Sequence, residues 1–330
     1  MDKIKLYPLK FGPIYQYRIW GGRRLTDLLT KPLPPDDPIG EAWILSDRQD
    51  HASKVTEGEL KGSTISQLME QFPERLMGKM AGRFKKFPLL LKFLDCKQVL
   101  SVQVHPSDQL KKYIPAGDSG KTESWVVLEA GKDAVIYAGL QPGTTEDKLR
   151  VLLKENEVAN ALAGFKPEVG DSVLIEAGTV HTLGDVVVFE VQENSDTTYR
   201  LYDWARIDKK TGKPRELQVE EAIACIDFNK TAIKPAKPLI ETKVPALREK
   251  LVEDAHFVMW RITGTQLFEV GQEDAPRILV CIDGEGELEY DGSQYALSKG
   301  EVMLLPAIAG ICSFKPKDNV VLLEIGLPKD

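Results

Sequence analysis

The fold of this chain follows from the stretch GDSVLIEAGTVH, which occupies residues 170–181. The short apolar run at 172–175 predicts a buried strand, and Gly178 marks a turn after it. His181 then opens the next strand, so the turn brings an imidazole to a fixed place on a β-structure. We take this strand, turn and histidine as the unit on which a functional site is built.

A second run supplies polar groups from one face of a strand. Gln103 and His105 alternate in the otherwise apolar sequence LSVQVH of residues 100–105, so their side chains leave the same face. Glu123 follows after a polar loop. A β-structure that gathers these side chains with His181 would use two of the chain's four histidines in a site for a divalent metal.

Composition places the chain among ordinary globular proteins. Of its 330 residues 42% are hydrophobic and 28% charged, and the length predicts roughly two domains. The net charge of -7 argues against nucleic-acid binding, which would need a basic face. No apolar stretch approaches the ~18 residues of a membrane span, so we expect a cytoplasmic protein without membrane association. The four cysteines are widely spaced and are expected to be reduced core residues.

Hydrophobic periodicity predicts a mainly β protein with a small number of helices. The helices are expected at about 63–85, 144–163 and 216–227, and the first opens with the capping-box pattern of Thr64 and Gln67. Short apolar or alternating runs between glycines and prolines predict strands elsewhere. In the first part of the chain these are 87–94, 99–105, 125–128, 135–140, 172–175 and 186–191, and in the second part 257–263, 277–282, 285–290, 294–297, 302–305 and 320–325.

The segment 230–245 is rich in proline and lysine and has the composition of a linker. We therefore expect a metal-bearing domain over 1–235, which carries the helices, and a second barrel without metal ligands over 236–330. The two share a weak internal repeat, because GEVMLLPA at 300–307 has the layout of GDSVLIEA at 170–177. Counting onward places Ile311 where His181 stands, so the second copy keeps the strand and loses the ligand.

The spacing Gly-x5-Pro-x-Gly-x2-His resembles the second cupin motif, met here at Gly170, Gly178 and His181 with Glu176 where proline is usual. Longer strings are similar to the type I mannose-6-phosphate isomerase family within the cupins: LSVQVHP at 100–106, KTE at 121–123 and FEVQENSDTTYR at 189–200. The strings stand in the expected order. The family's usual Lys-Pro-Glu is Lys-Thr-Glu here, and the chain is short and lacks the large helical insertion of longer members.

The resemblance implies two cupin-type, jelly-roll barrels and a metal-dependent isomerase of carbohydrate metabolism that interconverts mannose 6-phosphate and fructose 6-phosphate. It implies one divalent ion, taken as zinc on the family's example, although a mixed nitrogen and oxygen site also tolerates manganese or cobalt. The ligands that it implies are Gln103, His105, Glu123 and His181.

The resemblance also implies residues for substrate binding. Arg200 would lie in the pocket, and Lys92 and Ser101 would contact the sugar or its phosphate. Trp43 could pack on the sugar, although a core tryptophan explains it equally well. The chain has neither a GxxxxGK phosphate loop nor a nicotinamide fingerprint, so side chains must hold the phosphate, with Lys92, Ser101 and Lys121 as candidates.

The implied reaction moves a proton between C2 and C1 through an enediol. It needs a base at the carbon and positive charge at the oxygen. Glu190 and Lys121 both remain candidates for the base, with Glu190 slightly preferred, and Arg200 would stabilise the enediolate or hold the substrate. Two alternatives compete with this function: another metal-cupin enzyme of the dioxygenase type, and a non-catalytic sugar-phosphate-binding cupin.

Overall fold

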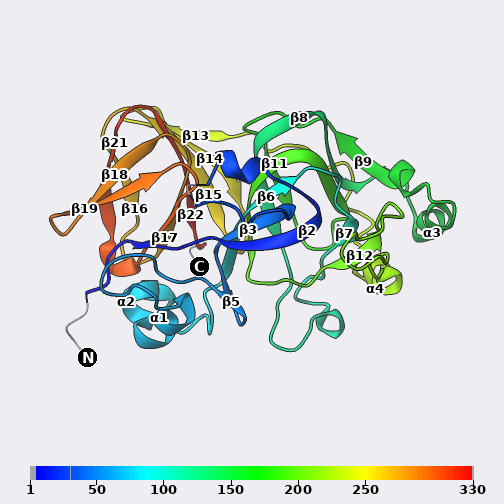
Figure 1. Cartoon of the computed structure of the whole chain (residues 1–330), viewed down its shortest axis with the longest axis horizontal. Helices are drawn as coiled ribbons and strands as arrows, with labels where there is room; N and C mark the ends of the chain where they lie inside the picture. The colour runs from blue at the N-terminus through cyan, green and yellow to red at the C-terminus, as the bar shows by residue number, and fades with distance from the viewer. Residues whose placement is uncertain (1–4, 30, 329–330) are drawn as a thin grey trace.

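The computed structural model describes residues 5–29 and 31–328. Figure 1 shows two β bodies side by side along the long axis of the molecule, with helices α1 and α2 beneath one of them and α3 and α4 at the far end of the other. The expectation of a mainly β protein with few helices is therefore confirmed. Among the residues described, no helix is long and apolar enough to cross a membrane.

The first body is built on a nine-stranded sheet in which β8, β11 and β6 occupy the centre. Its main path runs β10-β8-β11-β6-β3-β2, and β7, β9 and β12 pair outside this path. The strands are β2 (Ile14–Gly22), β3 (Ile39–Leu45), β6 (Leu89–Cys96), β7 (Val102–Val104), β8 (Glu123–Leu140), β9 (Leu162–Phe165), β10 (Ser172–Ile175), β11 (His181–Glu193) and β12 (Tyr199–Tyr202).

The second body combines a seven-stranded and a four-stranded sheet, and a short two-stranded sheet, β4 (Asp47–Arg48) with β5 (His51–Ala52), stands apart. The seven strands, in pairing order, are β1 (Leu9–Lys10), β20 (Val302–Leu305), β17 (Arg277–Asp283), β22 (Val320–Gly326), β15 (Val258–Gly264), β14 (Leu247–Glu253) and β13 (Leu239–Thr242). The four are β16 (Phe268–Gly271), β21 (Ile311–Pro316), β18 (Glu285–Tyr290) and β19 (Ser293–Ser298).

The N-terminal segment crosses from one body to the other. Leu9 and Lys10 of β1 pair with Leu304 and Met303 of β20. Strand β1 thus forms one edge of the seven-stranded sheet of the second body, and the chain then continues into the first body. The division of the chain into 1–235 and 236–330 stays a prediction. The N-terminal segment belongs to the first of these parts in sequence, but its strand β1 pairs with the second body.

The helices begin near the expected places but are shorter. They are α1 (Ile65–Gln71), α2 (Pro73–Met77), α3 (Glu146–Lys154) and α4 (Val219–Cys225). The capping box at Thr64 is confirmed, since its side chain accepts from the Gln67 backbone and the Gln67 side chain accepts from Thr64. A single helix over 63–85 was wrong, because Pro73 starts a second helix and cannot continue the first. The helix expected to reach 163 ends at Lys154, just before Asn156 with its φ of 58°.

The largest core lies between the two bodies. It joins Phe93 and Phe189 of the first sheet to Met259 and Leu323 of the second. Phe93 and Phe189 pack edge to face with ring centroids 5.8 Å apart, and neither is exposed. Burying one such ring stabilises the fold by roughly 1.5–3 kcal/mol. One face of β6 and β11 is thus fixed by this core, which leaves their other face to line the interior of the first body.

Candidate active site

The four predicted metal ligands converge where β7, β8 and β11 begin or end. His181 opens β11 opposite Gln103 of β7, and the Gln103 Nε2 atom lies 3.1 Å from His181 Nε2. Glu123 opens β8, with one carboxylate oxygen 3.4 Å from His105 Nε2 and the other 3.3 Å from His181 Nε2. The two histidines and Glu123 are at most 1% exposed. The structure therefore brings together residues that lie up to 78 positions apart in the sequence.

The unpaired atoms of this cluster are those that a cation would need. His105 Nδ1 donates to the Thr197 carbonyl at 3.0 Å and His181 Nδ1 to the Thr179 carbonyl at 2.9 Å. These bonds place the proton on Nδ1 and leave the Nε2 lone pairs facing Glu123. His105 Nε2 and Glu123 Oε1 are buried without a hydrogen-bond partner among the described residues, and Glu123 Oε2 lies in an ion pair with Lys121. A buried imidazole nitrogen and a carboxylate oxygen left without hydrogen bonds, beside a second imidazole and a glutamine amide, fit a divalent metal.

The charge states also suit a cation. Burial lowers the pKa of His105 to about 3, with the positive charge of Lys121 adding to the effect. Burial likewise lowers the pKa of His181. For Glu123 burial acts to raise the pKa, but Lys121 and the two imidazoles hold it well below its usual range. Neutral imidazoles and an ionised carboxylate are the forms that bind metals.

Lys121 lies against the same carboxylate. Its Nζ is 2.8 Å from Glu123 Oε2, and the residue is 4% exposed. Burial would lower the pKa of this amine, but Glu123 and Glu190 together raise it above its ordinary value. A lysine acting as the base would have to be neutral, so this arrangement favours Lys121 as a fixed positive charge.

Glu190 stands on the interior face of β11, level with Lys92 of β6 and Trp125 of β8. Its Oε2 accepts a hydrogen bond from Trp125 Nε1 at 2.8 Å, and its Oε1, 3.3 Å from Lys92 Nζ, has no hydrogen-bond partner. Burial raises the pKa of Glu190, and the charge of Glu123 adds to this. One carboxylate oxygen is thus held in place while the other remains available to accept a proton.

A cavity of about 380 Å³ opens over these groups. That size falls within the usual range for small-molecule sites. Its wall contains six of the residues singled out from the sequence, namely Lys92, Ser101, Gln103, Lys121, Glu190 and Arg200. His105, Glu123 and His181 are buried and are not part of this wall, whereas Gln103 and Lys121, which contact them, are.

Trp43 occupies a different position from the one expected of a sugar contact. It is 3% exposed and is not part of the cavity wall. Its Nε1 donates to Glu41 Oε2 at 2.7 Å, and Lys92 Nζ lies 5.2 Å from the centre of its ring. The packing interpretation of Trp43 agrees with this placement, and the indole orients two charged groups of the wall.

Arg200 reaches the cavity from β12, where it pairs with Gln103 of β7. Its Nη1 donates to the Glu216 carbonyl at 3.2 Å, and its Nε is buried without a partner. Within 5–29 and 31–328, no carboxylate lies close enough to form an ion pair with it. Burial lowers the pKa of Arg200, and the nearby positive charges of Arg215, Arg18 and Arg206 lower it further. The negative charge of Asp203 acts in the opposite direction and raises this pKa.

Sequence reasoning missed an ion pair in the wall. Arg18 of β2 binds Glu41 of β3 with two parallel bonds, Nε to Oε1 at 2.9 Å and Nη2 to Oε2 at 3.0 Å. Burial would raise the pKa of Glu41, but Arg18 and Lys92 lower it to about 2. The available signal was a glutamate inside the wholly buried strand β3, since a buried charge requires a partner. Arg215, which also lines the cavity, carried no local signal.

Together the fold and the site define a double-barrel cupin with a candidate divalent-metal centre in one barrel. The family model described as "Phosphomannose isomerase type I, catalytic domain" matches residues 8–124. The model described as "Mannose-6-phosphate isomerase, cupin domain" matches residues 249–318. The chain belongs to the type I phosphomannose isomerase family, because it is 36% identical to mannose-6-phosphate isomerase ManA of Bacillus subtilis over 93% of this chain and 95% of that protein.

Two further comparisons agree. The mannose-6-phosphate isomerase of Streptococcus mutans is 34% identical over 88% of this chain and 89% of that one. The crystal structure of the mannose 6-phosphate isomerase from Bacillus subtilis superposes with a TM-score of 0.89 at 28% identity and covers 98% of this chain and all of the other. The cupin architecture predicted from the sequence is confirmed, and the dioxygenase alternative is not favoured.

Proposed function

We propose that this chain is a metal-dependent aldose-ketose isomerase that interconverts mannose 6-phosphate and fructose 6-phosphate. The observation that carries the proposal is the juxtaposition of the buried His105, Glu123 and His181 with Glu190 at the wall of one cavity. Family membership and relatives named for this activity support the substrate. A non-catalytic binding protein would have no use for a carboxylate oxygen kept free of hydrogen bonds beside such a cluster.

The metal would be held by Gln103, His105, Glu123 and His181. We propose zinc, which accepts nitrogen and oxygen ligands of this kind. When bound, it would act as a Lewis acid toward the oxygens at C1 and C2, on which negative charge develops. The backbone carbonyls of Thr179 and Thr197, which accept hydrogen bonds from the two Nδ1 atoms, would fix both imidazole rings.

The chain's own residues supply the proton transfer. In the direction from aldose to ketose, Glu190 Oε1 takes the proton from C2, the C2-H electron pair forms the C1-C2 double bond, and the π pair of the C1 carbonyl moves onto O1. A proton then passes from the O2 hydroxyl to O1, the O2 electron pair forms the C2 carbonyl, and the C1-C2 double-bond pair takes the proton back from Glu190 at C1. Trp125 holds the other carboxylate oxygen during both steps, and Lys92 beside it favours the ionised form. Arg200 and Lys121 add fixed positive charge where the enediolate forms.

We also propose that the enzyme works in the cytoplasm on its small-molecule substrate, without nucleic-acid or membrane partners. All four cysteines are buried and unpaired, which agrees with a reducing compartment.

A coupled assay of mannose 6-phosphate conversion tests the proposal directly. The protein is assayed as purified, after removal of metal with a chelator, and after zinc is restored, with bound metal measured at each stage. Activity that disappears with the chelator and returns with one equivalent of zinc is expected. Absence of turnover at full metal occupancy would refute the substrate assignment.

A further inference from the structure

One carboxylate, Asp203, pairs with an arginine of the cavity wall and with a second arginine outside it. Asp203 Oδ2 accepts from Arg215 Nε at 2.8 Å, and Asp203 Oδ1 accepts from Arg215 Nη2 at 2.5 Å and from Arg206. Arg200, three positions before Asp203, has no carboxylate partner in the described parts of the chain. Asp203 therefore pairs with two of three neighbouring guanidinium groups, and the third has no carboxylate partner among the described residues. All three are partly buried, so this group of arginines carries more positive than negative charge and suits an anion.

Two of the three arginines face the cavity. Arg200 and Arg215 line it together with Arg18, whereas Arg206 does not. The backbone holds Arg200 and Arg215 on neighbouring segments, because Gln218 N donates to the Arg200 carbonyl at 2.9 Å and Arg200 Nη1 reaches the Glu216 carbonyl at 3.2 Å.

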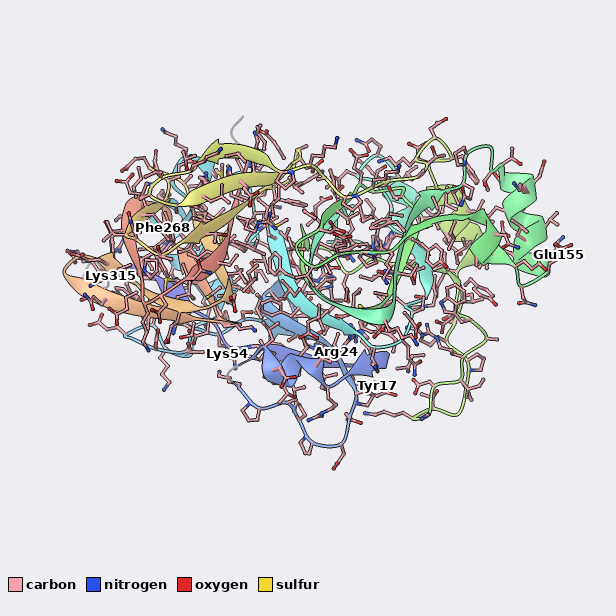
Figure 2. The ribbon with its side chains drawn as sticks, turned by 90° about the horizontal axis from the view of Figure 1, so that it is seen from above. Tyr17, Arg24, Lys54, Glu155, Phe268 and Lys315 are labelled. Atoms are coloured by element: carbon pink, nitrogen blue, oxygen red, sulfur yellow. The ribbon has the colours of Figure 1, made fainter. Side chains whose placement is uncertain are left out.

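Strand β2 also contributes Tyr17 and Arg18 to the wall of this cavity. Tyr17 OH donates to Asp208 Oδ1 at 3.2 Å and so ties β2 to the loop that follows β12, beside which Figure 2 labels Tyr17. Arg18, the next residue on β2, also lines the cavity, but its guanidinium is already bound to Glu41. Asp208 and Asp196 also line the cavity but form no ion pair with these arginines within the described residues.

We propose that Arg215 binds the phosphate of the substrate in this cavity. This deepens the proposed function and rests on it for the identity of the sugar phosphate. The lysines first considered for this role are already committed, Lys92 to Glu190 at 3.3 Å and Lys121 to Glu123 at 2.8 Å. Asp203 engages Nε and Nη2 of Arg215, which leaves Nη1 for a phosphate oxygen.

The structure provides a matched control for the test. Arg215→Gln and Arg206→Gln each remove one guanidinium from Asp203, but only the first removes a cation from the cavity wall. Binding of inorganic phosphate to the zinc-loaded protein is measured by calorimetry, and KM and kcat are measured with mannose 6-phosphate. Arg215→Gln is expected to weaken phosphate binding and raise KM by roughly 10- to 100-fold with kcat changed less than about threefold. Arg206→Gln should stay within about threefold of wild type in all three.

Arg215→Lys keeps the positive charge but loses the two parallel N–H donors of the guanidinium, so it should show an intermediate loss of phosphate affinity. This variant also serves as a second test if Arg215→Gln fails to fold. Equal losses in Arg206→Gln and Arg215→Gln, or wild-type phosphate affinity in Arg215→Gln, would overturn the proposal. Because phosphate binding is read without turnover, a chain that binds phosphate through Arg215 and leaves mannose 6-phosphate unchanged would support the subsite and refute the isomerase assignment.

Discussion

Replacing Glu190 with glutamine isolates the proton transfer from the other roles of the site. The amide has nearly the volume of the carboxylate, its oxygen can still accept from Trp125 Nε1, and the residue is 4% exposed. Substrate and metal should therefore bind as before. A positioned general base accelerates a reaction by 10²–10⁴-fold, so kcat is expected to fall by that factor, about 3–5 kcal/mol of barrier. KM should change by less than about threefold.

The same variant makes a prediction for stability. Burial, with the charge of Glu123, raises the pKa of Glu190 in the folded protein. Because this folded-state pKa exceeds the unfolded value, the ionised carboxylate opposes folding, and the opposition grows as the pH rises through that interval. A neutral amide removes this cost, so Glu190→Gln should unfold at pH 7 at a temperature no lower than wild type.

The assay is the coupled conversion of mannose 6-phosphate, run on protein whose zinc content has been measured. Glu193→Gln is a suitable control, because Glu193 lies on the same strand, points to the opposite face and is also buried. Its kcat should stay within about threefold of wild type. If Glu190→Gln holds a full equivalent of zinc and keeps more than a tenth of the wild-type kcat, Glu190 is not the base and Lys121 becomes the next candidate.

Three more outcomes follow from other parts of the structure. His181→Ala should reduce bound zinc below about a tenth of an equivalent by elemental analysis and abolish turnover, and retention of the metal would contradict the ligand set. Phe314→Ala, at a fully buried ring of the second barrel, should lower the free energy of unfolding in urea by about 3–5 kcal/mol while KM is unchanged. Burial raises the pKa of Glu193 to about 7, above its value in the unfolded chain. Between pH 4.5 and 8 the free energy of unfolding of wild type should therefore fall by up to about 3 kcal/mol relative to that of Glu193→Gln. If the free energies of unfolding in urea of the two proteins change equally with pH, this reasoning is refuted.

Local patterns predicted the parts of the fold that local interactions determine. The strand at 172–175, the turn at Gly178 and the histidine that opens the next strand appear as expected, and Gly178 has a φ of 85°. The strands at 285–290 and 302–305 have their predicted bounds. Each is a short apolar or alternating run with a glycine near its start, and the neighbouring residues carry that information.

Contacts between distant segments were not predictable in this way. The residues 129–133, EAGKD, look like a loop between two strands, yet β8 runs through them from Glu123 to Leu140 because it pairs with β11 on both sides of the polar stretch. The partners of Glu41 and Asp203 depend on which strand and loop reach the cavity mouth, and that follows only from the assembled sheet. The convergence of Gln103, His105, Glu123 and His181 could be predicted because a family resemblance supplied the distant pairing.

The two barrels share one strand-and-turn layout, but their turns differ, and among the described residues the cluster of His105, Glu123 and His181 has no counterpart at this turn of the second barrel. In the first, Gly178 adopts the left-handed conformation and His181 enters the interior without exposure. In the second, Ile308 lies in the short helix η5 (Ala307–Ala309), the left-handed residue is Gly310 at a φ of 62°, and Ile311 opens β21 half exposed. The backbone of this turn differs from the turn that directs His181 inward, and Phe268 and Phe314 pack in the core of the second barrel. Its sheet instead packs against the outer face of β6 and β11, so the second copy stabilises the strands that carry Lys92 and Glu190.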